Sequence, residues 1–419
     1  MKPEMYLITK DFPYGHGEES FIRPEYPYLC KKFDVSVVAT EVKEEGCLQS
    51  KDVKAYRIPT VQKFPGKFFS LLCFLCERDC RLEIAAIIRG KSQVAKRIYR
   101  ALMFGTAAEA FYRRLRKIIN LSKNSNALFY FYWFDYKCFG LSMHKDKFPN
   151  IQIIARTHGY DLYDERELYG KQFFKPQMDA KLKRLIFASQ YAKDYYLGRY
   201  QKEESEKYPV HRLGVSNKQV TCQGRRQMWV ENSFLLVSCS HAIGIKRIDR
   251  IIDGLSMVSD SKLRWVHLGG GDQLPQLQER ARRKLDGRKN IAYDFYGTLT
   301  NESVLQFYQE NYVGCFITTT ETEGGSPVSV QEALSFGVPV IATGIGDLPK
   351  MVKGNGILLS ESPTVVEVGQ AIEKMIEIYN TEEYFLMCQS SLEIFEEKFD
   401  AENNFIELVQ DLEGLYDRR

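Results

Sequence analysis

A glycine-rich loop in the second half of the chain groups residue types that suit an anion. Glycine and serine let a backbone approach a ligand closely, and a proline suits the first turn of the helix that follows. The free N–H groups at a helix start favour negative charge. We therefore predict a diphosphate site here. The residues concerned are Gly324, Gly325, Ser326, Pro327 and Val328.

Carboxylates flank this predicted anion site. Glu321 and Glu323 lie in the loop, and Glu332 lies on the following helix, behind the mouth of the site. Carboxylates beside an anion are useful if they hold hydroxyl groups, such as those of a ribose and a sugar. The pattern therefore predicts a ligand that carries a diphosphate, a pentose and a sugar.

The elements that would position this loop are two buried strands and a helix. The apolar residues Val313 to Ile317 predict a strand before the loop, and Pro327 predicts the start of a helix after it. Gly337 ends that helix, and Val338 to Ala342 predicts a second strand. Strands alternating with helices predict a doubly wound parallel sheet, whose ligands bind at the carboxyl ends of the strands.

The first half of the chain shows the same alternation. Glu4 to Thr9 and Asp34 to Thr40 predict two strands, joined by a loop and a helix. Gly15 and Gly17 in that loop allow a close backbone approach to a ligand, and His16 lies between them. A loop in this position is at the ligand-binding edge of such a sheet.

A second polar loop follows the apolar strand Ile151 to Ala155. It contains Arg156, His158 and Asp161. Loops at strand ends often carry function, and we favour a site over a structural role. The alternative is that His158 is a satisfied core histidine, as single histidines most often are.

The second half restarts with the strand Ser233 to Cys239, whose loop contains His241, Lys246 and Arg247. The segment from Glu332 to Thr343 resembles the nucleotide-sugar signature of retaining GT-B glycosyltransferases of family 4. The matching pieces are Glu332-Ala333 and the run Gly337 to Thr343. The resemblance includes capsule, exopolysaccharide and lipopolysaccharide enzymes and extends over nearly the whole chain.

The resemblance implies roles for individual residues. Glu332 would hold the ribose, Glu323 the donor sugar, and Lys246 with Arg247 the diphosphate. His158 would lie near the sugar carbon, so His158 and Glu323 are the predicted catalytic residues. The remaining predicted donor contacts are Gly15, Gly17 and the Gly324 to Val328 loop, and the predicted acceptor contacts are His16, Arg156 and Asp161.

Two positions depart from the family pattern. The family separates its two glutamates by seven residues, whereas eight lie between Glu323 and Glu332, and the position with the family spacing is Gly324. Either Glu323 keeps the role through a bulge in the loop, or Glu321 takes it. In addition, His241 stands where many relatives have an arginine that grips the diphosphate.

The implied architecture is the GT-B fold, in which two Rossmann-like doubly wound parallel-sheet domains face a central cleft. We expect an acceptor domain at 1–215, a linker at 216–232 and a nucleotide-sugar domain at 233–400. We expect a helix at 401–419 to cross back to the first domain.

Charge is unevenly distributed over a chain whose formal net charge is only +4. Residues 1–215 carry 38 Lys and Arg against 25 Asp and Glu. The region 89–117 is rich in Lys and Arg, has apolar residues between them and contains one acidic residue, Glu109. An amphipathic basic helix suggests an anionic membrane surface, and the alternative is a solvated basic face.

The remaining features limit the class of protein. The chain shows no secretory signal pattern and no membrane-length apolar run, so we expect a cytoplasmic protein, peripheral on the inner face of the plasma membrane if region 89–117 binds lipid. No binding module for nucleic acid is recognised. The glycine pattern of a dinucleotide-dependent dehydrogenase is also missing after the first strand. No cofactor or metal is expected.

These features predict a retaining, metal-independent hexosyltransferase of surface polysaccharide biosynthesis. It would move a sugar from a nucleotide-diphosphate sugar to a saccharide or lipid-linked acceptor. Two alternatives stay open, a nucleotide-sugar epimerase on the same fold and a catalytically silent nucleotide-sugar-binding protein.

Overall fold

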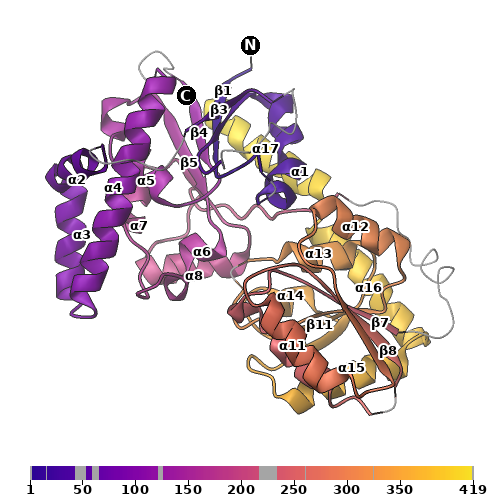
Figure 1. The fold of residues 1–419 in the computed structure, drawn as a ribbon. Coiled ribbons are helices and arrows are strands. Elements are labelled where there is room, and N and C mark those ends of the chain that lie inside the picture. Colours follow the sequence, from indigo (N-terminus) through magenta and orange to yellow (C-terminus); the bar gives the residue numbers. More distant parts are fainter. Residues whose placement is uncertain are drawn as a thin grey trace. The chain divides into compact units, whose positions relative to one another are not determined.

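The computed structural model describes residues 2–15, 17–42, 53–58, 66–120, 126–216, 234–259, 261–323 and 325–417. The chain divides into two compact units. Unit 1 comprises Met1–His211 and Phe405–Arg419, and unit 2 comprises Arg212–Asn404. Figure 1 shows a sheet flanked by helices in each unit. Most of the expected linker, residues 217–232, lies outside the described residues.

Unit 1 is built on a parallel sheet of six strands in the order β3-β2-β1-β4-β5-β6. The strands are β1 (Glu4–Thr9), β2 (Asp34–Ala39), β3 (Ala55–Arg57), β4 (Leu128–Phe131), β5 (Gln152–Arg156) and β6 (Arg184–Ile186). The central strands are continuous apolar runs because helices cover both of their faces. β4, for example, is buried at every position. Tyr6 of β1 stacks on Phe129 of β4, with ring centroids 4.9 Å apart.

The helices of unit 1 connect these strands. They are α1 (Glu19–Lys32), α2 (Gly66–Cys76), α3 (Arg78–Arg89), α4 (Val94–Ile118), α5 (Tyr136–Ser142), α6 (Gly159–Leu162), α7 (Lys175–Asp179) and α8 (Gln190–Tyr200). Two short 3-10 turns, η1 (Lys145–Lys147) and η2 (Asp164–Arg166), complete the set. Figure 1 shows α2 and α3 at the outer edge of the unit, beside α4.

The basic region 89–117 lies mostly in α4, and one side of this helix faces inward. Nine of its residues are buried, including Gly105, Ala108 and Phe111. Several of its basic side chains also have partners within the unit. Arg100 pairs with Glu167 at 2.7 Å, and Arg113 pairs with Glu109 at 2.8 Å. The apolar residues between the basic ones therefore belong in part to the core of unit 1.

The last helix of the chain, α17 (Ala401–Asp417), packs mainly against unit 1. Its Phe405 lies beside Tyr28, with ring centroids 5.8 Å apart. Its Asp411 accepts a hydrogen bond from His211 at 3.1 Å. The helix thus closes unit 1 with the final residues of the chain.

Unit 2 has a second parallel sheet of six strands in the order β12-β11-β10-β7-β8-β9. The strands are β7 (Phe234–Cys239), β8 (Leu263–Leu268), β9 (Ile291–Phe295), β10 (Cys315–Thr318), β11 (Val340–Thr343) and β12 (Gly356–Leu359). The two parallel sheets with flanking helices confirm the predicted doubly wound fold. The edge strands β3 and β12, which are short, were not predicted from the sequence.

The helices of unit 2 cover both faces of its sheet. They are α10 (Ile248–Leu255), α11 (Leu274–Leu285), α12 (Asn301–Glu310), α13 (Val328–Ser335), α14 (Leu348–Met351), α15 (Val365–Ile378) and α16 (Glu382–Lys398), with the 3-10 turn η3 (Gly244–Lys246). One apolar cluster on each face of the sheet holds these layers together. Among the described residues, no helix is both long enough and apolar enough to cross a membrane.

Candidate functional site

The predicted anion loop of unit 2 lies between β10 and α13. Pro327 is the N-cap residue of α13, and its φ of −65° suits the start of a helix. Ser326 is buried, and its hydroxyl donates to Asp347 at 2.5 Å. The side chain of Gln331 donates to the carbonyl of Ser326 at 2.9 Å. The loop is therefore held from two sides. Gly324 lies outside the described residues.

A second loop, after β7, lies against this one. The N–H of Glu321 donates to the carbonyl of Ile245 at 2.8 Å, and the hydroxyl of Thr320 donates to the same carbonyl at 3.0 Å. The hydroxyl of Thr319 donates to the carbonyl of Arg247 at 2.7 Å. The two loops thus form one continuous edge at the carboxyl ends of β7 and β10, which are neighbours in the sheet.

Lys246 and Glu323, both predicted site residues, are in direct contact. The Lys246 ammonium lies 2.7 Å from a carboxylate oxygen of Glu323. Both side chains are partly exposed. The predicted role of Glu323 stays a prediction. An anion arriving at Lys246 would compete with this carboxylate.

Arg247 and Glu321 form a separate ionic group. Arg247 pairs with Asp249 at 3.0 Å and also contacts Glu321. Arg250 lies 3.1 Å from the same Glu321 carboxylate. Glu321 is therefore engaged by two arginines, whereas Glu323 is engaged by Lys246. His241, in contrast, is exposed on its loop.

Glu332 is buried in α13, with 4% of its surface exposed. Its carboxylate accepts a hydrogen bond from the side-chain amide of Asn301 at 2.5 Å. Burial raises the pKa of Glu332 to about 7, and the Asn301 amide opposes that rise. The nearby Cys239 is partly buried, and its thiol pKa is raised by burial and by the Glu332 charge. The contact between Asn301 and Glu332 was not predicted from the sequence.

A glycine turn after β8 borders the same edge of the sheet. Gly269 has a φ of +143°, and a Cβ there would lie 2.0 Å from the carbonyl oxygen of Ser240. Gly270 is equally tight, because a Cβ would lie 2.2 Å from the hydroxyl of Thr298. These glycines let the loops after β7, β8 and β9 approach one another closely.

The first loop of unit 1 is organised around a buried carboxylate, Glu18. Its carboxylate accepts hydrogen bonds from the backbone N–H groups of Lys10, Asp11 and Phe12 at 2.8, 2.8 and 3.1 Å. The indole N–H of Trp133 also donates to it. Burial raises the pKa of Glu18, and these four donors oppose the rise. Glu18 therefore fixes the loop that the sequence analysis predicted as a binding element.

The glycines of this loop are close to one of its own side chains. The N–H of Gly17 donates to the carboxylate of Asp11 at 3.0 Å, and a Cβ on Gly15 would lie 2.3 Å from that carboxylate. Asp11 thus occupies the inside of the loop next to both glycines. Their predicted role as donor contacts stays a prediction. His16 lies outside the described residues.

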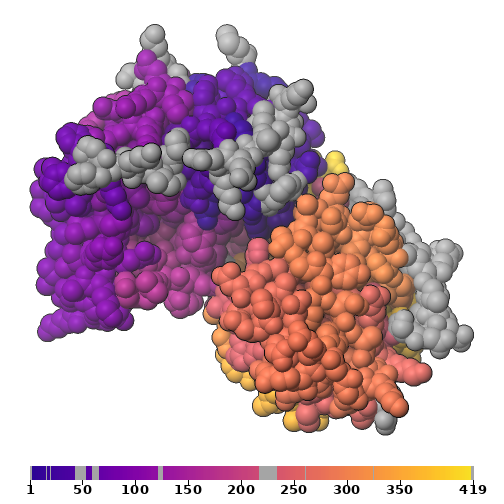
Figure 2. Space-filling model, viewed as in Figure 1, coloured from indigo at the N-terminus to yellow at the C-terminus, as the bar shows by residue number. Residues whose placement is uncertain are grey.

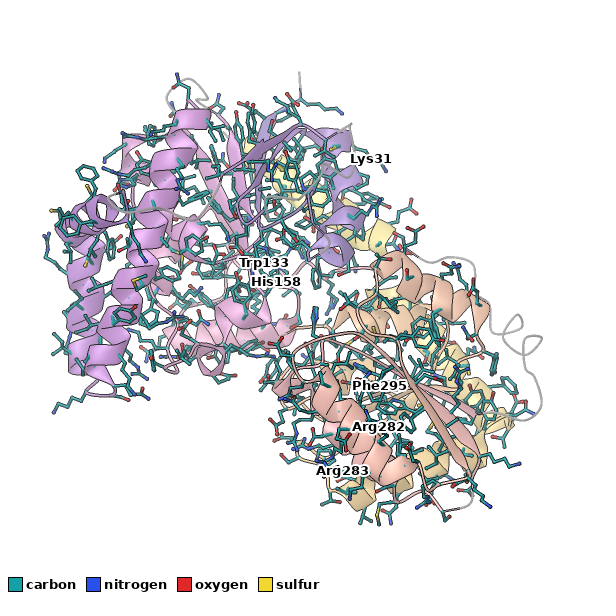
Figure 3. All side chains as sticks on the ribbon, in the orientation of Figure 1. Lys31, Trp133, His158, Arg282, Arg283 and Phe295 are labelled. Atoms are coloured by element: carbon teal, nitrogen blue, oxygen red, sulfur yellow. The ribbon has the colours of Figure 1, made fainter. Side chains whose placement is uncertain are left out.

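His158 lies in an aromatic environment at the end of β5. Its Nε2 is 3.1 Å from the carbonyl oxygen of Tyr132, so Nε2 carries a proton and donates it. The centre of the Trp133 ring is 4.2 Å from the centre of its own ring, and Figure 3 shows the two side chains next to each other. Burial, with the charges of Arg156 and Lys10, lowers the pKa of His158 well below its usual value. His158 is therefore neutral at physiological pH.

Asp161 holds the backbone of this loop. Its two carboxylate oxygens accept from the N–H groups of His158 at 2.7 Å and of Phe134 at 2.8 Å. Burial raises its pKa to about 6. Only 2% of the residue is exposed, so we assign it a positioning role, in place of the predicted contact with an acceptor.

Arg156 is completely buried. Its guanidinium lies 3.0 Å from the carboxylate of Glu25 in α1 and donates to the hydroxyl of Tyr130 at 2.9 Å and to the carbonyl of His211 at 3.0 Å. A side chain without exposed surface cannot touch an acceptor directly. We therefore assign Arg156 a positioning role as well, since it ties β5 to α1 beneath the loop that carries His158.

Lys10 and Tyr160 extend the unit 1 cluster, and the sequence analysis missed both. The Lys10 ammonium lies 4.2 Å from the centre of the Trp133 ring and 3.9 Å from the centre of the Tyr160 ring. The Tyr160 hydroxyl donates to Asp135 at 3.0 Å. A cation held between two rings beside a neutral histidine can position a polar or anionic ligand. Aromatic residues near strand ends are so common that no signal in the sequence singles these out.

A family of known proteins matches a segment that lies within unit 2. Residues 232–377 match the family described as glycosyl transferases group 1. The matched segment covers less than half of the chain. It contains both loops, the Lys246–Glu323 pair and Glu332. No curated protein matches the sequence significantly.

Solved structures share the fold of the whole chain. Sucrose-phosphate synthase from Thermosynechococcus elongatus has a TM-score of 0.72, is 15% identical and covers 100% of each chain. Anabaena HepE, solved with UDP and glucose, has a TM-score of 0.66 at 14% identity and covers 98% of this chain and 99% of its own. The lipopolysaccharide outer core galactosyltransferase WaaB in its apo form has a TM-score of 0.58 at 16% identity. The match covers 94% of this chain and 99% of the WaaB chain.

These similarities confirm the predicted GT-B fold, with its two Rossmann-like units. Within the glycosyl transferases group 1 segment, the geometry supplies three groups along one edge of a sheet. They are a lysine that can meet an anion, a loop glutamate beside it and a buried glutamate behind it. Such a set can bind a diphosphate and the hydroxyl groups on either side of it.

Proposed function

We propose that the chain is a glycosyltransferase that moves a sugar from a nucleotide-diphosphate sugar to a saccharide or lipid-linked saccharide acceptor. The observation that carries the proposal is the contact between Lys246 and Glu323 in the glycosyl transferases group 1 segment. It joins a cation for the diphosphate to a carboxylate for the sugar at the edge where parallel sheets bind ligands.

In this proposal, the donor diphosphate takes the place of Glu323 at the Lys246 ammonium. Negative charge grows on the diphosphate as the glycosidic bond breaks, and an ammonium fixed beside it stabilises that charge. The free N–H groups at the start of α13, which follows the same loop as Glu323, add to the effect. Because these groups supply positive charge, we propose that the reaction needs no metal ion.

The two glutamates then have different partners. Glu323, released from Lys246, accepts hydrogen bonds from the sugar hydroxyls. Glu332 accepts hydrogen bonds from the ribose, and Asn301 holds its carboxylate in place. In unit 1, the neutral His158 and the Lys10 ammonium contact the acceptor.

The finer parts of the proposal are the stereochemistry and the biological role. We propose retention of configuration through attack from the face of the leaving group, a hexosyl donor, and a role in surface polysaccharide synthesis at the cytoplasmic side of the membrane. The WaaB galactosyltransferase, whose printed name refers to lipopolysaccharide, supports this role by analogy of fold.

The test is nucleotide release in the presence and absence of an acceptor. UDP-glucose is a reasonable first donor, since the HepE structure contains UDP and glucose. A transferase releases nucleotide when acceptor is added, an epimerase interconverts sugars without acceptor, and a silent binder does neither. Lys246→Ala and Glu332→Ala should each lower transfer at least tenfold, whereas Arg282→Ala on the exposed face of α11 should not. Transfer within threefold of the unchanged protein in either site variant would show that the site is misplaced.

A further inference from the structure

The helix α2 in unit 1 is apolar on the face that points to solvent. Of its residues, only Ser70 and Phe74 are buried. Phe74 fits against α4 at Gly105, where a Cβ would lie 2.1 Å from its ring. At 3.6 residues per turn, Ser70 and Phe74 share one side of the helix. That side attaches α2 to the rest of unit 1.

The opposite side of α2 carries four large apolar residues. Their exposed fractions are 51% for Phe68, 52% for Phe69, 45% for Leu72 and 42% for Leu75. Counting 100° per residue places their mean direction opposite to that of Ser70 and Phe74. Contiguous exposed apolar surface of this kind is uncommon on monomeric proteins and marks an interaction site. We refer to these four residues as the α2 face.

The α2 face is bordered by basic side chains at both ends. Lys67 is exposed in the first turn of α2. The Arg113 guanidinium of α4 lies 4.0 Å from the centre of the Phe69 ring, and Arg116 and Lys117 are exposed one turn further on. At the other end, Arg81 donates to the carbonyl of Cys76 at 3.4 Å.

The acidic residues close to the C-terminal end of α2 are Glu77 and Asp79, and both are only partly exposed. Arg78, between them, is exposed, as are Leu82 and Ile88 on the following helix α3. Figure 2 shows the violet segment that contains α3 and α4 at the outer edge of unit 1. The surface is therefore apolar in the middle and mainly basic at its margins.

We propose that the α2 face docks on an anionic lipid surface. A helix that lies in a membrane interface buries its apolar side among the acyl chains, while flanking Lys and Arg side chains reach the anionic headgroups. The basic margins favour an anionic lipid surface over a second copy of the chain. In a dimer built on the α2 face, the basic margins of the two copies would lie close together and repel each other. The proposal does not depend on the proposed transferase activity, because it concerns binding of lipid only.

The proposed membrane contact on α2 differs from the one that the sequence predicted. The sequence analysis placed it in region 89–117, where α4 turns much of its apolar surface to the core. Region 89–117 has one exposed large apolar side chain, Tyr99, whereas the α2 face has four. The sequence shows α2 only as a short apolar run. Residues of α4 contribute charge at the margin, through Arg116 and Lys117.

The apolar part is tested by sedimentation of the full chain with vesicles. Vesicles of phosphatidylcholine alone are compared with vesicles that contain one-third phosphatidylglycerol. The unchanged protein should bind the anionic vesicles at least tenfold more strongly. The double variant Phe68→Ser, Leu72→Ser should lose at least tenfold in partitioning. The matched control is Leu386→Ser in α16, since Leu386 is 56% exposed, and it should bind as the unchanged protein does.

The basic margin is tested by neutralising two charges. Lys67→Gln, Arg78→Gln should lower partitioning by about fivefold for each charge removed, and the effect should shrink in high salt. The matched control is Arg282→Gln, Arg283→Gln. Both arginines have highly exposed side chains on α11, where Figure 3 labels them.

Three results would overturn the proposal. The first is equal partitioning of the Phe68→Ser, Leu72→Ser variant and its control, with folding of both verified by circular dichroism. The second is equal binding to neutral and anionic vesicles. The third is a dimer in light scattering that Phe68→Ser, Leu72→Ser disrupts while the unchanged chain fails to bind vesicles, which would make a second copy the occupant. Loss of nucleotide binding in other variants would leave the vesicle results unaffected.

Discussion

The buried carboxyl of Glu332 predicts a specific dependence of stability on pH. Its pKa is raised by burial from 4.5 to about 7. Between these two pH values, the folded state holds a proton that the unfolded chain has released. Stability should therefore fall as the pH rises through this interval, and the loss should be complete once the pH exceeds 7. Glu332→Gln removes the titration and keeps an acceptor for Asn301.

The magnitude follows from the two pKa values. A rise from 4.5 to about 7 corresponds to about 3 kcal/mol. For a unit of roughly 150–250 residues, each kcal/mol changes the unfolding midpoint Tm by about 2–4 °C. Relative to Glu332→Gln, the Tm of the unchanged protein should therefore fall by about 6–12 °C between pH 4.5 and pH 8.

The assay is differential scanning calorimetry of both proteins in a series of buffers across this range. Taking the difference between the two proteins removes the titration of every other group. A Tm difference that stays constant within about 1 °C across the series would refute the reasoning, because Glu332 would then have an ordinary pKa in the folded state.

Three further predictions concern groups that hold the two sites in place. Glu25→Ala leaves the Arg156 guanidinium buried without its carboxylate and should cost about 3–5 kcal/mol in denaturant unfolding; an unchanged midpoint would contradict the ion pair. Gly269→Ala would place a Cβ 2.0 Å from the Ser240 carbonyl oxygen, so Tm and nucleotide affinity should both fall, and normal values for both would refute the tight turn. Asp161→Ala leaves two backbone N–H groups without their acceptor and should cost about 1–3 kcal/mol for each, measured by unfolding; a change below 1 kcal/mol would speak against its positioning role.

The sequence predicted the parts of the fold that depend on local pattern. Buried parallel strands are long apolar runs, so β7 and β10 could be located, and Pro327 marked the start of α13. The short edge strands β3 and β12 carry little such signal. The exposed α2 face could not be predicted either, because an apolar run in a sequence indicates burial unless the packing around it is known.

The candidate site, like the fold, could be predicted from the sequence only in part. The resemblance to the family pattern indicated Lys246, Glu323 and Glu332, and the structure adds that Lys246 and Glu323 are in contact. The sequence could not show which polar residues near a strand end face inward. Arg156 and Asp161 were predicted as ligand contacts, yet both are buried. Arg156 pairs with Glu25, which is distant in the sequence, and Asp161 accepts hydrogen bonds from backbone N–H groups.

Lys10 and Asn301 were missed for a related reason. Each acts through a neighbour that lies far along the chain, Lys10 through Trp133 and Asn301 through Glu332. Spacing within one segment carries no information on such pairs. Only the sheet order, which brings β1 beside β4, makes the contact between Lys10 and Trp133 visible.

The most direct test of the central claim is calorimetric titration of the full chain with UDP and UDP-glucose. The claim is that the loop edge around Lys246 binds the diphosphate of a nucleotide sugar. Binding to the unchanged protein, with at least tenfold weaker binding by Lys246→Ala and an unchanged Kd for the surface control Arg282→Ala, is the predicted result. Binding of equal strength by Lys246→Ala and the unchanged protein would contradict the claim.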